Sequence, residues 1–132
     1  MVKANFAYTS IEVRDLERSI KFYTEKLGMK LMRRSKIAET NGEIAELRSP
    51  DGHQLLELNW YAEHNRYRSG DELDHLASDV EDVEKALAQL KAENVEVAME
   101  PFDEGEGRLA FVKDPDGIWI ELTGPREKPE LS

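Results

Sequence analysis

Hydrophobic and polar positions follow an order that occurs twice along the chain. Residues 8–16 read YTSIEVRDL, and residues 75–83 read HLASDVEDV. Each stretch has a short strand-like alternation and then an Asp, whose carboxylate can cap a helix by accepting a first-turn N–H hydrogen bond. Because the elements that follow also recur in the same order, the pattern indicates an internal duplication.

A helix is predicted after each Asp. Apolar residues recur there at helical spacing and form two stripes: Leu16, Ile20, Tyr23 and Leu27 in the first half, and Val83, Leu87 and Leu90 in the second. Gly28 and Asn94 stand just after these stripes. Both residue types readily adopt the left-handed conformation that ends a helix.

Three strands are predicted after each helix. They cover about 29–32, 44–47 and 54–58 in the first half, and 95–99, 109–112 and 118–123 in the second. The last two of each set flank a Pro-Asp-Gly turn, at 49–52 and 114–117. The chain is therefore interpreted as a single α+β domain, 1–132, of two βαβββ modules with curled mixed sheets. The modules span about 5–59 and 74–124, and a linker, 60–73, joins them.

Composition narrows the classes of function. The net charge of −10 opposes binding to nucleic acid, whose phosphates would be repelled. The absence of cysteine excludes disulfides and thiolate metal sites. No run approaches the roughly 18 apolar residues that a membrane span needs, and no secretory signal is recognised. These observations predict a cytoplasmic protein without a nucleic-acid or membrane partner.

Four polar side chains occupy equivalent places in the duplication. Tyr8 pairs with His75, and Glu57 pairs with Glu121. Strand alternation places Glu121 on the face opposite Ile120 and its apolar neighbours. Two carboxylates and an imidazole held on strands suit a transition-metal site, although such residues also occur on the solvent face of any half-exposed strand.

Two segments resemble the vicinal oxygen chelate superfamily (glyoxalase, bleomycin resistance protein, dioxygenase), and within it glyoxalase I, the lactoylglutathione lyase. Residues 15–31, DLERSIKFYTEKLGMKL, are similar to the first helix of the bacterial lyases. Residues 111–122, FVKDPDGIWIEL, are similar to their last hairpin. The resemblance covers about residues 6–123.

The resemblance implies a divalent transition metal (Ni, Zn, Co, Mn or Fe) and assigns Glu57, His75 and Glu121 as ligands. The first family ligand, usually His or Gln, falls on Tyr8. A neutral phenol is a poor ligand because its ordinary pKa is about 10. We therefore expect Tyr8 to lie close to the metal as a hydrogen-bond donor, with binding as a phenolate or loss of the site as alternatives.

The activity implied is that of a glyoxalase I-like lyase or isomerase acting on a small molecule. A proton next to a carbonyl is moved while the metal stabilises the enediolate as a Lewis acid. Glu121 is the expected base and Glu57 the second candidate. Further substrate contacts are expected from the linker and from a lid at 103–108, through Trp60, Arg66, Arg68 and Arg108. A homodimer is also expected.

The residues expected to bind glutathione depart from the family pattern. Glutathione-using relatives often carry Arg where this chain has Glu12 and Asp71, and acidic side chains there would repel glutathione carboxylates. Two alternatives stay open: a metal-free ligand-binding protein that sequesters antibiotics, and an acyl-CoA epimerase. A third alternative, an extradiol dioxygenase, is disfavoured. The dioxygenase site uses two His and one carboxylate, whereas His75 is the one His at the four candidate positions of this chain.

Overall fold

The chain folds into two compact units, Met1–Ser69 and Gly70–Ser132. The computed structural model describes residues 1–3, 5–38, 40–53, 55–63, 70 and 73–126. The division falls within the predicted linker 60–73.

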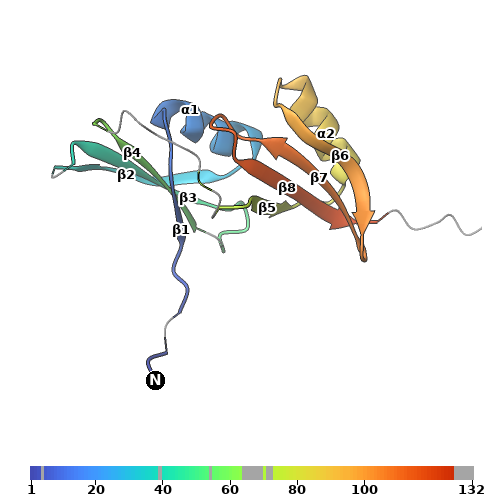
Figure 1. Cartoon of the computed structure of the whole chain (residues 1–132), viewed down its shortest axis with the longest axis horizontal. Coiled ribbons are helices and arrows are strands. Elements are labelled where there is room, and N and C mark those ends of the chain that lie inside the picture. Colours follow the sequence, from blue (N-terminus) through green and yellow to red (C-terminus); the bar gives the residue numbers. More distant parts are fainter. Residues whose placement is uncertain (4, 39, 54, 64–69, 71–72, 127–132) are drawn as a thin grey trace, which may run out of the picture. The chain divides into compact units, whose positions relative to one another are not determined.

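The first unit contains one four-stranded mixed sheet and one helical segment (Figure 1). Its elements are β1 (Thr9–Glu12), α1 (Leu16–Lys21), the π-helical turn η1 (Phe22–Lys26), β2 (Lys30–Ile37), β3 (Gly42–Arg48) and β4 (Leu55–Tyr61). The strand order is β1-β4-β3-β2, and β1 runs parallel to β4 while the other pairs are antiparallel. The last strand of the unit therefore lies between the first and the third.

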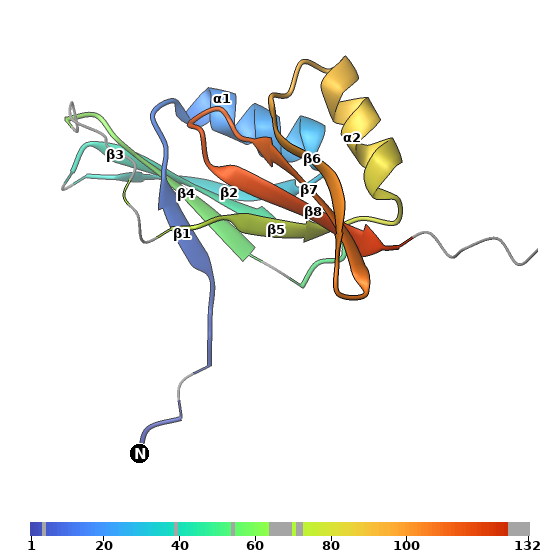
Figure 2. The same cartoon turned by 45° about the vertical axis from the view of Figure 1, so that its right-hand side comes forward.

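The second unit repeats this topology (Figure 2). It contains β5 (Leu76–Asp79), α2 (Val83–Ala92), β6 (Val97–Glu104), β7 (Gly107–Lys113) and β8 (Trp119–Pro125), in the sheet order β5-β8-β7-β6. Here β5 is parallel to β8 and the other pairs are antiparallel. The predicted α+β class with two βαβββ modules is confirmed.

The residues predicted to begin and end the two helices do so, with one difference in the first helix. Asp15 and Asp82 accept first-turn backbone N–H groups at 3.1 and 3.0 Å. Gly28 and Asn94 end the helical segments with positive φ angles of 73° and 64°. The difference is that the first helix ends in a wider turn, in which the Leu27 N–H bonds the carbonyl of Phe22 at 3.3 Å.

The core of each unit lies between its helix and one face of its sheet. Both predicted helical stripes are buried there, apart from half-buried Leu27. In the second unit they meet the alternate β7 and β8 residues Ala110, Val112, Ile120 and Leu122, each exposed by 1% or less. Burying such a side chain stabilises the fold by about 1.5–3 kcal/mol. The opposite sheet face is left for polar chemistry.

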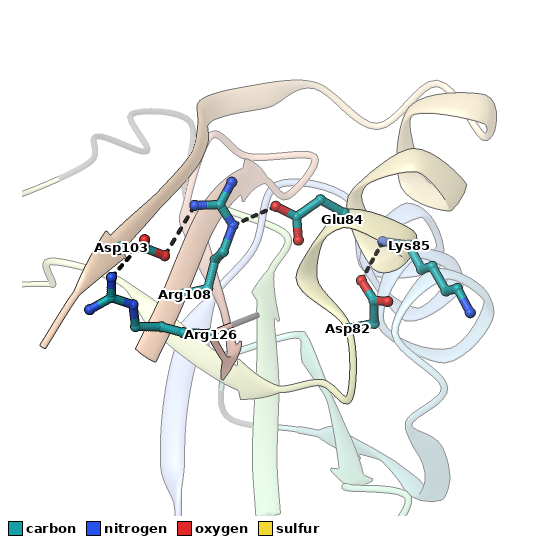
Figure 3. Close-up of polar contacts among 6 residues, drawn as sticks. All are labelled: Asp82, Glu84, Lys85, Asp103, Arg108 and Arg126. Carbon is teal, nitrogen blue, oxygen red and sulfur yellow. Dashed lines mark hydrogen bonds and ion pairs between the residues drawn. The ribbon is translucent and has the colours of Figure 1, made fainter. Parts of the chain in front are cut away.

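An arginine in each unit ties the first helical turn to the sheet. Arg34 of β2 binds Glu17 at 2.7 Å and Glu43 at 2.8 Å. Arg108 of β7 binds Glu84 at 2.5 Å and Asp103 at 3.1 Å, and Arg126 joins Asp103 at 3.2 Å (Figure 3). Hydrogen bonding to Glu43 and Glu17 raises the pKa of Arg34 above its usual value, and Glu84 and Asp103 do the same to the pKa of Arg108.

Close packing at Gly124 gives a test of the parallel β5–β8 pairing. A Cβ at Gly124 would lie 2.7 Å from the Val80 carbonyl oxygen, just where the Val80 N–H bonds the Thr123 carbonyl at 2.9 Å. We expect Gly124→Ala to lower the free energy of unfolding by about 1–3 kcal/mol, because the added methyl must push the backbones apart.

The matched control is Gly107→Ala in β7, where the nearest atom to an added Cβ is 3.6 Å away. Urea denaturation of both variants checks the prediction. Equal stabilities would contradict the close approach of Gly124 to the Val80 backbone.

Candidate active site

The parallel strand pairs place the four candidate residues in equivalent positions. In the first unit Ser10 of β1 is aligned with Glu57 of β4, and in the second Ala77 of β5 is aligned with Glu121 of β8. Tyr8 stands two residues before Ser10, as His75 does before Ala77. The predicted correspondence between Tyr8 and His75, and between Glu57 and Glu121, is thus present in the strand register.

Glu57 lies on the sheet face that points away from α1. Its strand neighbours Leu56 and Leu58 are buried on the helix side, whereas Glu57 is half-buried. One of its oxygens, Oε1, accepts hydrogen bonds from Asn59 Nδ2 at 2.9 Å and from Ser10 Oγ at 3.3 Å. The carboxylate is therefore held in one orientation.

His75 lies on the same sheet face as Glu121. Its ring packs edge-on against Phe111 with centroids 5.4 Å apart, and Phe111 is the β7 residue aligned with Glu121. The His75 Nδ1 atom lies 2.7 Å from a carboxylate oxygen of Asp74. In the neutral imidazole, a carboxylate acceptor at Nδ1 selects the tautomer that is protonated there and leaves the Nε2 lone pair for a metal ion.

The side chains of Glu121 and Tyr8 are less constrained than those of Glu57 and His75. Glu121 is half-buried and makes no hydrogen bond or ion pair with another described residue. Tyr8 directly precedes β1, is 45% exposed and likewise has no polar partner within the described part of the chain. Both are accessible to a ligand.

Two of the four predicted substrate contacts, Trp60 and Arg108, lie on the helix side of their sheets. Glu57 and Asn59 point to the sheet face away from α1. Trp60 directly follows Asn59 in β4, so its side chain points to the opposite face, on the α1 side. Arg108 lies on the α2 side of β7, engaged with Glu84 and Asp103 (Figure 3). Arg66 and Arg68 lie outside the described residues. The substrate-binding role of these four residues stays a prediction.

The predicted lid at 103–108 is a β-hairpin. Asp103 is aligned with Arg108 and Glu104 with Gly107 in the antiparallel β6–β7 ladder. Gly105, at a φ of 59°, makes the tight turn possible. The segment therefore has regular structure, and its role as a lid stays a prediction.

Four supporting residues were missed by sequence reasoning: Ser10, Asn59, Asp74 and Phe111. A partial signal existed for two of them. Alternation already places Asn59 on the Glu57 face, and Asp74 is the direct neighbour of His75. Ser10 and Phe111 contribute through strand register, which the linear sequence does not display.

The donor set suits a divalent transition metal. Carboxylate oxygens and an imidazole nitrogen are the ligands that such ions take, and structural support behind Glu57 and His75 is typical of metal ligands. Among the described residues, no single group of three or more His, Cys, Asp or Glu gathers closely enough to bind an ion. Neither Tyr8 with Glu57 nor His75 with Glu121 alone supplies the three protein ligands of a catalytic site.

Comparison with known proteins decides the family. The model of the Glyoxalase/Bleomycin resistance protein/Dioxygenase superfamily matches residues 5–122. The chain belongs to this superfamily.

Named relatives point to one branch of the superfamily. A probable lactoylglutathione lyase of Vibrio parahaemolyticus is 36% identical over 92% of this chain and 91% of its own length. A probable chloroplastic lactoylglutathione lyase of Arabidopsis thaliana is also 36% identical, but the chain spans only 38% of that protein. The predicted resemblance to glyoxalase I is confirmed by these relatives.

Solved structures agree with this likeness. The trypanothione-dependent glyoxalase I of Leishmania major matches with a TM-score of 0.80 and 35% identity over 92% of this chain and 87% of its own. A Zea mays glyoxalase I mutant matches with a TM-score of 0.78 and 31% identity, over 91% of this chain and 44% of its own. The glyoxalase-like fold and the prediction of a glyoxalase-like enzyme are confirmed, and this likeness implies a divalent metal cofactor.

The lengths and composition of the helices bear on membrane insertion. None of the helices in the described ranges is long and apolar enough to cross a membrane.

The position of Arg108 predicts how its replacement acts. We expect Arg108→Gln to lower the thermal unfolding midpoint, because α2 loses its link to β7, and to leave the KM for substrate unchanged. Arg34→Gln, which breaks the equivalent link in the first unit, is the matched control. A large rise in KM for Arg108→Gln alone, with folding retained, would return Arg108 to the substrate site.

Proposed function

We propose that this chain is a metal-dependent glyoxalase I-like lyase. It converts the thiohemiacetal of methylglyoxal and a thiol into a 2-hydroxyacyl thioester. The observation that carries the proposal is the strand register that puts His75 and Glu121 on one sheet face, with Nε2 of His75 left available. The relatives named lactoylglutathione lyase support the reaction class.

The metal would be held by Glu57, His75 and Glu121, with Tyr8 as a nearby hydrogen-bond donor. Ni, Zn, Co, Mn and Fe all accept such oxygen and nitrogen ligands. When bound, the ion supplies Lewis-acid polarisation of the substrate oxygens. Asp74 fixes the proton on Nδ1 of His75, and Phe111 supports the ring from the side, so the imidazole approaches in one orientation.

Glu121 is the proposed base. It takes the proton from the carbon that bears the sulfur and returns it to the neighbouring carbon, so substrate and product are isomers. Its side chain has no polar partner in the described part of the chain, and such a group can rotate between the two carbons. Phe111, with Trp119 at a centroid distance of 5.5 Å, provides an apolar wall beside Glu121.

A charge-neutral replacement of the base tests the mechanism. With metal supplied, we expect Glu121→Gln to keep its fold and lose about 10²–10⁴ in kcat, because the amide cannot accept the proton. Turnover is followed by thioester absorbance with a panel of thiols that includes glutathione. Glu104→Gln, which neutralises an exposed carboxylate in the same unit, is the control. An undiminished rate for Glu121→Gln would refute its role.

Two rival functions make different predictions in the same assays. An acyl-CoA epimerase uses the same kind of proton transfer, so it would exchange the proton of a chiral acyl thioester and leave the methylglyoxal adduct unchanged. A metal-free binding protein is favoured by Tyr8, which stands where the family usually has a ligand. That protein would take up no metal and show no turnover.

Assembly and location are part of the proposal. We propose a homodimer, and a cytoplasmic location as predicted from the composition of the chain. Light scattering after size-exclusion chromatography gives the mass in solution, and 15.1 kDa would identify a single chain.

A further inference from the structure

The two site carboxylates differ in how they are held. On Glu57, Oε1 accepts from Asn59 and Ser10, and Asn59 also donates to Ser10 Oγ. The three side chains form a closed triangle of hydrogen bonds. Oε2 of Glu57 receives no hydrogen bond from the described residues, so it remains available to a ligand.

The second unit lacks this triangle. By register, Ala77 stands where Ser10 stands, and Thr123 stands where Asn59 stands. Alanine has no polar side-chain atom, and Thr123 makes no hydrogen bond with Glu121. The duplication therefore preserves the two carboxylates but gives a hydrogen-bonded support only to Glu57.

The triangle is anchored by packing. Asn59 is 6% exposed and sits in β4 between the antiparallel β3 and the parallel β1, so its amide has little freedom to turn. A donor fixed in this way lowers the entropy that the carboxylate must lose when a ligand binds. Glu121, without such a support, keeps the rotational freedom that a proton carrier uses.

We propose that Asn59 and Ser10 are positioning residues that hold Glu57 as the fixed carboxylate ligand, with Oε2 presented to the metal. This division leaves Glu121 as the mobile carboxylate. The inference rests on the proposed metal-dependent function. Asn59 and Ser10 act through Glu57 and need not touch substrate.

Two replacements remove the support with little effect on folding. Asn59→Leu keeps a similar shape and removes the donor, and Ser10→Ala reproduces the second unit at an exposed position. We expect each to weaken binding of Ni or Zn by about 10–100-fold, as is typical for residues behind metal ligands. Ser10→Thr retains the hydroxyl and should bind metal as the original chain does.

Activity provides a second readout. Because the support acts on metal binding, excess metal should restore the turnover of Asn59→Leu and Ser10→Ala, whereas it should not restore Glu121→Gln. Thr123→Ala, the equivalent change beside Glu121, is the matched control and should leave metal affinity unchanged. Unchanged metal affinity in Asn59→Leu and Ser10→Ala would overturn the inference.

A measurement on the metal-free protein separates this inference from the proposed function. The side-chain amide protons of Asn59 should shift and exchange faster in NMR spectra of Glu57→Ala, because their acceptor is lost. Failure of the original chain to bind metal would overturn the proposed function, whatever the NMR result. Amide signals insensitive to Glu57→Ala would overturn the support of Glu57, even if metal binds.

Discussion

Parallel pairing of the first and last strands is the constraint on which the rest depends. In each unit it brings together segments that are far apart in sequence, as in the 49-residue separation between Ser10 and Asn59. It also fixes which face each side chain takes, since a shift by one residue would move Glu57 or Glu121 to the helix side. The helices, capped by Asp15 and Asp82, cover the other face and keep the sheet in this register.

On this common frame the two units have diverged in their polar chemistry. The first holds a carboxylate with two donors, and the second holds an imidazole between Asp74 and Phe111. At the β3 position that corresponds to Phe111, the first unit has Glu46. Duplication thus explains why the candidate ligands recur, and later divergence explains why one carboxylate is fixed while the other is unrestrained.

Sequence reasoning worked where structure is set by local chemistry. The caps, the left-handed residues Gly28 and Asn94, the apolar stripes and the face of Glu121 all follow from short-range pattern. Strand length and long-range register, by contrast, cannot be read from short-range pattern. Because β4 continues to Tyr61, Trp60 falls on the helix side of the sheet, and because β7 begins at Gly107, Arg108 faces α2. The hydrogen bonds of Asn59 and Ser10 depend on strand register, which joins positions distant in sequence.

The most direct test is elemental analysis of protein purified without a metal-affinity tag, beside Glu57→Ala from the first unit and His75→Ala from the second. The account predicts about one divalent transition metal per chain in the original protein and loss of that metal in both variants, because each variant removes one of the three proposed ligands. Protein that takes up no metal, or that keeps it when His75 is replaced, would contradict the account.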